Sequence, residues 1–208
     1  TQTSAKVTID LENGGQLNAD LLIAADGIHS TVRSQVFLAD SPRPSGYVSW
    51  RGIADADAIV HLQIPVSAYV DMGPRLSFVY YFVSGGKRLN WLALGQTNDP
   101  KRESWSQIAS REEVIDAFAG WYDRPRQVIE STPDIFVTAL HDREPLKTWV
   151  SGRVALLGDA AHAMLPYHAQ GAVQSLEDAW VLARTLEQHR DRPNEALKKY
   201  ETLRFDRA

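Results

Sequence analysis

The residues best placed to do chemistry follow an apolar run in the second half of this 208-residue chain. Residues 152–179 read GRVALLGDAAHAMLPYHAQGAVQSLEDA, and Asp159 follows the apolar stretch 154–157 with only Gly158 between them. In an open α/β sheet, ligands collect outside the carboxyl ends of the strands. An aspartate there has a short side chain suited to accept hydrogen bonds from ligand hydroxyls. Gly158 lacks bulk, so a ligand can approach the backbone closely.

A second feature is Gly171, which lies 12 residues after Asp159 at the expected start of a helix running to about Gln188. The first N–H groups of a helix have no intrahelical partner and lie at the positive end of its dipole. They stabilise an anion or an electron-rich ring edge, and a glycine has no side chain to block them. The spacing allows one extended ligand to contact both Asp159 and this helix.

A similar pattern occurs near the start of the chain, in residues 21–33, which read LLIAADGIHSTVR. An apolar run typical of a buried strand ends at Asp26-Gly27, and Ser30 is expected to cap a short helix through Val36. The sequence therefore predicts two buried strands, each followed by an aspartate.

Together, the two segments resemble the DG and GD motifs of the FAD-dependent aromatic hydroxylases, the class A flavoprotein monooxygenases. The stretch DREPLKTWVSGRVALLGDAAHAMLPYHAQGA is especially similar to the salicylate and hydroxybenzoate hydroxylase branch. The resemblance covers nearly the whole chain. It implies an oxidoreductase that hydroxylates a small aromatic acid with FAD, NAD(P)H and O2, by way of a flavin hydroperoxide.

The resemblance also implies roles for individual residues. Asp159 should hydrogen-bond the ribityl chain of FAD, and Pro166 should pack beside the reactive edge of the isoalloxazine. The residues expected to contact cofactors are Asp26, Gly27, Arg33, Gly158, Asp159, Pro166, Gly171, Ala172 and Val173. The N–H groups of Gly171, Ala172 and Val173 should face the pyrimidine edge of the flavin. Asp26, Gly27 and Arg33 belong to the DG motif, which the family ties to FAD and nicotinamide cofactor binding.

The catalytic candidates are Pro166, Tyr167, His168 and Tyr81. Loss of its proton makes a ring hydroxyl more nucleophilic, so a Tyr or His relay near the substrate would help oxygen transfer. This branch places a substrate-facing residue near Tyr80 and Tyr81, and strand alternation sends only one of the two toward a pocket.

Three further residues leave two interpretations open. Arg51 either meets a substrate carboxylate or lies on the surface. Trp50 and Trp91 are on expected strands, and they either belong to the core or line a substrate pocket. His162 and His168 are six residues apart, a spacing that no helix presents as one face, so no metal site is expected.

The surrounding pattern predicts an α/β (α+β) fold. Residues 1–41 and 146–208 should form part of a Rossmann-like FAD-binding domain, and residues 42–145 an antiparallel or mixed substrate sheet with flanking helices. The substrate sheet should cover about 46–97, with a further strand at 134–140. In the first domain, a hairpin turn is expected at 13–15.

Three helices are expected besides the one after Ser30. Ser110 should cap the first, which Pro125 closes, and Pro193 should open the last. The helix from Gly171 has an apolar side at helical spacing, formed by Val173, Leu176, Ala179, Trp180, Ala183 and Leu186. Glu177 and Asp178 are interpreted as first-turn partners of its dipole.

The composition of the chain excludes several classes of chemistry and partner. Apolar residues make up 44% and charged residues 23%, the net charge is −4, and there is no cysteine. This excludes thiol catalysis and disulfides and argues against a nucleic-acid partner, which asks for a basic face. No apolar run approaches the roughly 18 residues of a membrane helix, so a cytoplasmic protein is expected. Whether it forms a homodimer is left open.

One departure from the family pattern stands out, because GxGxxG, which binds the ADP part of FAD in that family, does not occur in the chain. The chain is therefore expected to be a fragment that lacks this unit. Two alternatives stay open. The first is a catalytically inert domain that only binds ligands or a partner. The second is a related flavin oxygenase acting on a polyketide, kynurenine or nicotinate derivative.

Overall fold

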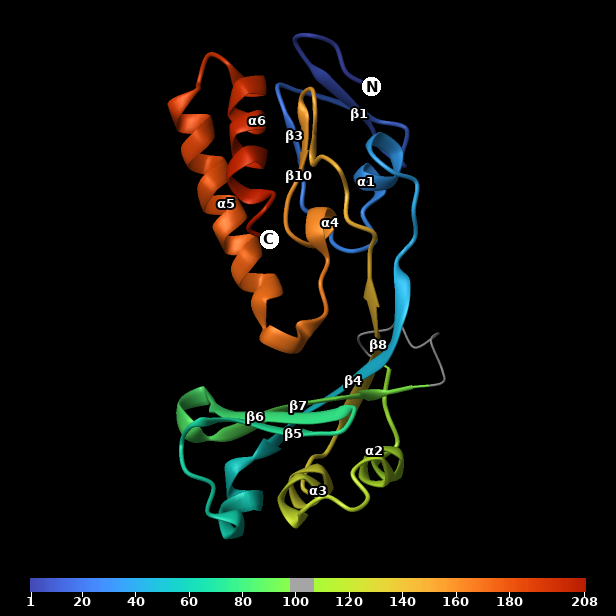
Figure 1. Cartoon of the computed structure of the whole chain (residues 1–208), viewed down its shortest axis with the longest axis vertical. Helices are drawn as coiled ribbons and strands as arrows, with labels where there is room; N and C mark the ends of the chain where they lie inside the picture. The colour runs from blue at the N-terminus through green and yellow to red at the C-terminus, as the bar shows by residue number, and fades with distance from the viewer. Residues whose placement is uncertain (98–106) are drawn as a thin grey trace. The chain divides into compact units, whose positions relative to one another are not determined.

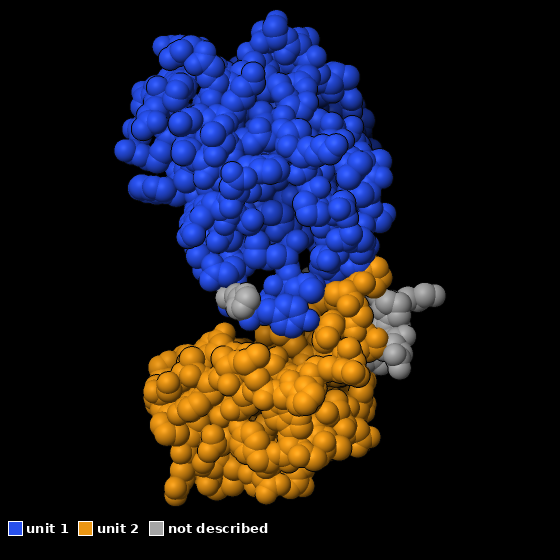
Figure 2. Space-filling model, viewed as in Figure 1, with its two compact units in different colours: residues 1–43, 141–208 blue, residues 44–140 orange. Residues whose placement is uncertain are grey.

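The computed structural model describes residues 1–97 and 107–208, apart from the side chain of His168. The chain divides into two compact units (Figure 2). Thr1–Arg43 and His141–Ala208 form the first, and Pro44–Leu140 form the second. Both contain helices and strands (Figure 1), which confirms the predicted α/β class. The boundaries expected from the sequence lie a few residues from those of the units.

The first unit is built around a three-stranded sheet in the order β3-β10-β9. Strand β10 (Val154–Leu156) pairs in parallel with β3 (Leu22–Ala24) and antiparallel with β9 (Val150–Ser151). All three residues of β10 are buried, as the continuous apolar run predicted. Strands β1 (Val7–Asp10) and β2 (Gln16–Ala19) form the expected antiparallel hairpin.

The helices of this unit begin close to where the sequence places them. They are α1 (Thr31–Val36), α4 (Asp159–His162), α5 (Gln170–Gln188) and α6 (Pro193–Arg204), with a 3₁₀ turn η3 (Pro166–His168) before α5. Helices α5 and α6 lie side by side (Figure 1). The buried Tyr200 donates a hydrogen bond from its hydroxyl to the Leu156 carbonyl, which ties α6 to β10.

Helix α5 buries a different face from the one its apolar residues suggest. The apolar side is largely exposed, with Leu176 at 72% and Trp180 at 69% of full exposure. The stripe that packs inward consists of Gln174, Asp178, Leu182 and Thr185. Hydrogen bonds from Arg204 of α6 to Asp178 and Gln174 select this orientation.

The second unit is a five-stranded sheet in the order β5-β6-β7-β4-β8, with one face covered by helices. The strands are β4 (Arg43–Asp55), β5 (Ala68–Gly73), β6 (Leu76–Val83), β7 (Arg88–Gln96) and β8 (Ile135–Asp142). Strands β5, β6, β7 and β4 pair antiparallel, and the short 3₁₀ segments η1 (Ala56–Leu62) and η2 (Ser84–Gly86) follow β4 and β6.

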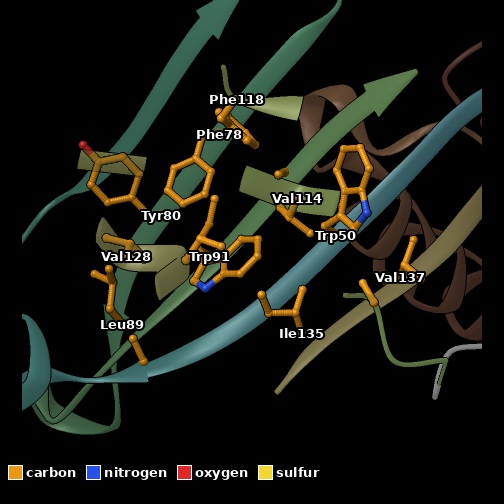
Figure 3. Packing of buried hydrophobic residues seen from close by; sticks show 14 of the residues in the cluster. Trp50, Phe78, Tyr80, Leu89, Trp91, Val114, Phe118, Val128, Ile135 and Val137 are labelled. Atoms are coloured by element: carbon orange, nitrogen blue, oxygen red, sulfur yellow. The ribbon is translucent and has the colours of Figure 1, made fainter. Parts of the chain in front are cut away.

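The core of the second unit is aromatic (Figure 3). Trp50, Phe78, Tyr80 and Trp91 pack with Phe118 and neighbouring aliphatic side chains. The rings of Phe78 and Trp91 are stacked with centroids 5.4 Å apart. Trp50 and Trp91 therefore belong to the core, which decides between the two interpretations left open for them.

Helices α2 (Arg111–Ala117) and α3 (Asp123–Glu130) supply the rest of this core. Ser110 caps α2 by accepting a hydrogen bond from the Glu113 N–H, as predicted. The expectation that Pro125 closes this helical segment is wrong. Helix α2 ends at Ala117, and Pro125 lies in the first turn of a second helix, where a missing N–H costs no hydrogen bond.

Among residues 1–97 and 107–208, no helix is long and apolar enough to cross a membrane. The same residues contain no cluster of three or more histidine, aspartate or glutamate side chains that could hold a metal ion.

Candidate cofactor site

The parallel pairing of β3 and β10 brings the two aspartate-bearing segments to one edge of the sheet. Ala24 and Leu156 are register partners at the carboxyl ends of these strands, and the Leu157 N–H donates to the Ala24 carbonyl at 2.9 Å. Asp26 follows Ala24 by two residues, and Asp159 follows Leu156 by three. This is the edge at which ligands bind in open α/β sheets.

Asp159 is exposed at the start of α4, and no described residue donates a hydrogen bond to its carboxylate. An ideal Cβ built on Gly171 would lie 3.9 Å from Asp159 Oδ1. The carboxylate therefore lies beside the first turn of α5. The structure brings together the two features that the sequence singled out separately.

The start of α5 is open to a ligand. Ala169 precedes the helix in a left-handed conformation with φ 52°, and its side chain makes no capping hydrogen bond. Ala172 and Val173 are exposed in this first turn. A 19-residue helix presents its positive dipole end here, next to the acidic Asp159.

The two glycines of this region have different reasons to be glycine. Gly158 has φ +61°, and a Cβ there would lie 2.7 Å from Ser175 Oγ, so the fold itself excludes a side chain. Gly171 has no positive φ, and its nearest neighbour would be Met164 Cγ at 3.8 Å, an ordinary contact. The fold tolerates a methyl group at 171, which leaves that space to a ligand.

The sequence reasoning missed the group that holds this region together, which is the carboxylate of Asp178. This fully buried side chain accepts hydrogen bonds from the Gly158 N–H at 3.1 Å, from His162 Nε2 at 2.6 Å and from Arg204 Nε at 2.7 Å. The contacts link α5 to α4, to α6 and to the residue before Asp159. The interpretation of Asp178 as a first-turn dipole partner is wrong, because it lies two turns into α5 and pairs with side chains.

Opposing effects act on the ionisation of Asp178. Burial raises its pKa, but the hydrogen bonds from His162, Arg204 and the Gly158 N–H outweigh burial and hold the pKa below its ordinary value. Asp178 is therefore a carboxylate when folded. Arg204 also bonds Glu177 Oε2 at 2.6 Å and Gln174 Oε1 at 2.5 Å, so the polar stripe of α5 is satisfied by α6.

Arg33 of the DG segment also joins neighbouring elements through buried polar contacts. Its fully buried guanidinium donates to the carbonyls of Ala160 and Ala161 in α4 and forms an ion pair with Asp40 at 3.0 Å. Arg143 joins the same Asp40 at 2.9 Å. These contacts show that Arg33 holds α4 in place.

The other DG residues lie in the turn after β3. Asp26 accepts hydrogen bonds from the N–H groups of Thr31 and Val32 and so caps α1 together with Ser30. Gly27 has φ +77°, the left-handed conformation that glycine adopts without strain.

The catalytic candidates fall in both units. Pro166 begins η3, and the half-exposed Tyr167 lines a cavity of about 560 Å³ with Met164 and Gln170. The side chain of His168 lies outside the described residues. In the second unit, Tyr81 is 41% exposed on the face of the sheet opposite the core.

Tyr80 points the other way, into the core of the second unit. It is fully buried, stacks on Tyr69, and its hydroxyl accepts a hydrogen bond from Arg124 at 3.1 Å. Alternation therefore leaves Tyr81 as the accessible member of the pair.

Comparison with known proteins agrees with this arrangement. The whole chain, residues 1–208, matches the family described as FAD binding domain. The chain belongs to this family.

Curated proteins similar to this chain include named monooxygenases and hydroxylases. Aurachin C monooxygenase/isomerase of Stigmatella aurantiaca is 39% identical over 202 residues, which are 96% of this chain and 51% of that protein. Salicylate hydroxylase of Pseudomonas putida is 38% identical over 232 residues, covering 100% of this chain and 53% of that protein.

The fold is shared with solved members as well. The structure of a salicylate hydroxylase substrate complex matches all of this chain and 56% of its own, with a TM-score of 0.88 at 30% identity. The present chain spans about half the length of the curated relatives it matches.

Within this family member, Asp178 and Arg204 are the site-supporting residues that the sequence analysis missed. One signal was available. Gln174, Asp178, Leu182 and Thr185 recur at helical spacing, so a polar stripe ran beside the apolar one. Its partner lies on α6 in a different part of the sequence, and the spacing within α5 does not identify it.

Proposed function

We propose that the protein is an FAD-dependent monooxygenase that hydroxylates a small aromatic acid, with NADH or NADPH as reductant and O2 as co-substrate. One observation carries the proposal most directly. The Asp159 carboxylate lies beside the open first turn of α5, and no described residue donates a hydrogen bond to it. An acceptor beside the first turn of a long helix, at one sheet edge, is what a polyhydroxylated, electron-rich cofactor needs.

The residues present fit the flavin part of FAD. Asp159 would accept hydrogen bonds from ribityl hydroxyls, and the N–H groups of Gly171, Ala172 and Val173 would face the pyrimidine edge. The space over Gly171 that a Cβ would occupy supports this assignment. When bound and reduced, the flavin supplies the activation of O2 and the transfer of one oxygen atom to the ring. The positive end of α5 would stabilise the negative charge of reduced flavin.

The remaining chemistry belongs to the substrate. Tyr167 and Tyr81 are accessible, and a tyrosine hydroxyl near the ring can relay the proton of a phenolic substrate. Pro166, at the start of η3, would pack beside the reactive edge of the flavin and exclude water from it. We place the protein in the cytoplasm, because its sequence has no cysteine and no apolar run of membrane length.

The test is oxidation of NADH and of NADPH by the purified flavin-loaded protein, followed with and without a panel of hydroxybenzoates. We expect at least one acid to stimulate both nucleotide oxidation and O2 uptake and to be recovered with one more hydroxyl group. Stimulation by none of them would remove the aromatic-acid claim. Failure to take up FAD would favour the inert ligand-binding domain instead.

A further inference from the structure

A separate cavity of about 400 Å³ lies wholly within the second unit. Arg51, Ile53, Asn90, Asp134 and Phe136 line it. A cavity of about 150 Å³ already holds a benzene ring, so this one has room for a substituted single-ring ligand. Its volume falls in the range of small-molecule sites.

Strand register shows which face of the sheet carries this cavity. Ile53 pairs with Asn90, and Asn90 pairs with Tyr81, so the three form one row across β4, β7 and β6. Trp50, one residue before Arg51, points into the core. Alternation therefore sends Arg51 to the opposite face, with Tyr81 and Ile53. The cavity lies along the row of the accessible tyrosine.

Arg51 is the cationic group of the cavity wall. Its guanidinium carbon lies 5.9 Å from the centroid of the Phe136 ring, so the cation stacks over an aromatic face. Burial lowers the pKa of Arg51, which marks a guanidinium partly removed from water. A charge in such a setting interacts more strongly with an anion than one in bulk water. The planar guanidinium fork matches a carboxylate in particular.

We propose that this cavity anchors the substrate, with the carboxylate of an aromatic acid on Arg51 and the ring against Ile53 and Phe136. Asp134, which also lines the cavity, is an acceptor for a ring hydroxyl or amino group. The inference rests on the proposed function, because it names the substrate class and the residue that selects it.

The experiment compares an acid with its uncharged amide. Binding of 3-hydroxybenzoate and of 3-hydroxybenzamide to the protein is measured by calorimetry, for the wild type and for Arg51→Gln. We expect the acid to bind the wild type about 10- to 150-fold more tightly, the range for hydrogen bonds to charged groups. Arg51→Gln should remove this preference and leave the affinity for the amide unchanged.

Two further variants serve as controls. Arg88→Gln removes an exposed arginine of the same sheet that lies 3.7 Å from Asp55, and it should retain the preference for the acid. Arg51→Lys keeps the charge without the planar fork and should give an intermediate preference. Equal binding of acid and amide by the wild type, or an undiminished preference in Arg51→Gln, would overturn the inference.

A parallel FAD titration distinguishes failure of the Arg51 anchor from failure of the proposed function. If the wild type binds FAD and oxidises NAD(P)H with an aromatic acid, but Arg51→Gln retains full preference for the acid, only the anchor assignment fails. If the wild type binds no FAD, the proposed function fails, and the binding data alone decide whether the cavity takes aromatic acids.

Discussion

At the scale of single residues, the candidate site depends on two glycines, which have no side chain. Gly158 is required by backbone conformation and by contact with Ser175. Gly171 meets no such requirement and borders the acceptor Asp159. The first is a folding constraint, whereas the second leaves room for a ligand.

Alanine substitutions separate these two reasons. We expect Gly158→Ala to lower the free energy of unfolding by about 1–3 kcal/mol, because a non-glycine residue is strained at φ +61°. Gly171→Ala should leave stability within about 1 kcal/mol of the wild type, since glycine is a poor helix residue, while weakening FAD binding. Urea unfolding and flavin titration measure the two effects. Equal stability of both variants would contradict the distinction.

At the scale of elements, local signals predicted where strands and helices lie, but not how they pack. The two buried strands, the hairpin at 13–15 and the Ser110 cap were all predictable, because residues adjacent in sequence determine them. The buried face of α5 was not, because Arg204 of α6 draws the polar stripe inward. The break between α2 and α3 was missed because proline is as well suited to open a helix as to close one.

The Asp178–Arg204 pair lends itself to a stability measurement. Asp178→Asn leaves a buried guanidinium without its full counter-charge, so we expect a loss of about 3–5 kcal/mol in the free energy of unfolding. Glu177→Gln removes the more exposed partner of the same arginine and should cost much less. Similar losses in the free energy of unfolding of both variants would contradict the claim that the burial of Asp178 makes its ion pair the more important one.

The same pair predicts a dependence on pH. Hydrogen bonds hold the folded-state pKa of Asp178 below its ordinary value of 3.8. The stability that this carboxylate contributes is therefore fully present above that pH and is lost as the pH falls through the lower folded value. Between neutral pH and pH 3, Asp178→Asn should lose less stability than the wild type. A larger loss in the variant would contradict this assignment.

At the scale of the whole molecule, the chain supplies one coherent part of the proposed flavin site. Two segments more than a hundred residues apart meet at one sheet edge through β3 and β10. The second unit carries an accessible tyrosine, Tyr81, in one row with Asn90 and Ile53, which line a cavity together with an arginine. The positions of Asp26 and Asp159 at one sheet edge were predictable from the motifs and the strand order. The buried ion pairs that hold this region were not, because the two partners of each pair come from separate elements.

The most direct test of the flavin assignment is a titration of FAD against the protein, followed by flavin fluorescence, with Asp159→Ala as the variant. Asp191→Asn, an exposed change in the turn between α5 and α6, is the control. Loss of hydrogen bonds to a charged acceptor predicts a Kd weaker by about 10- to 150-fold for Asp159→Ala and no change for the control. An unchanged Kd for Asp159→Ala would contradict the assignment of this carboxylate to the flavin.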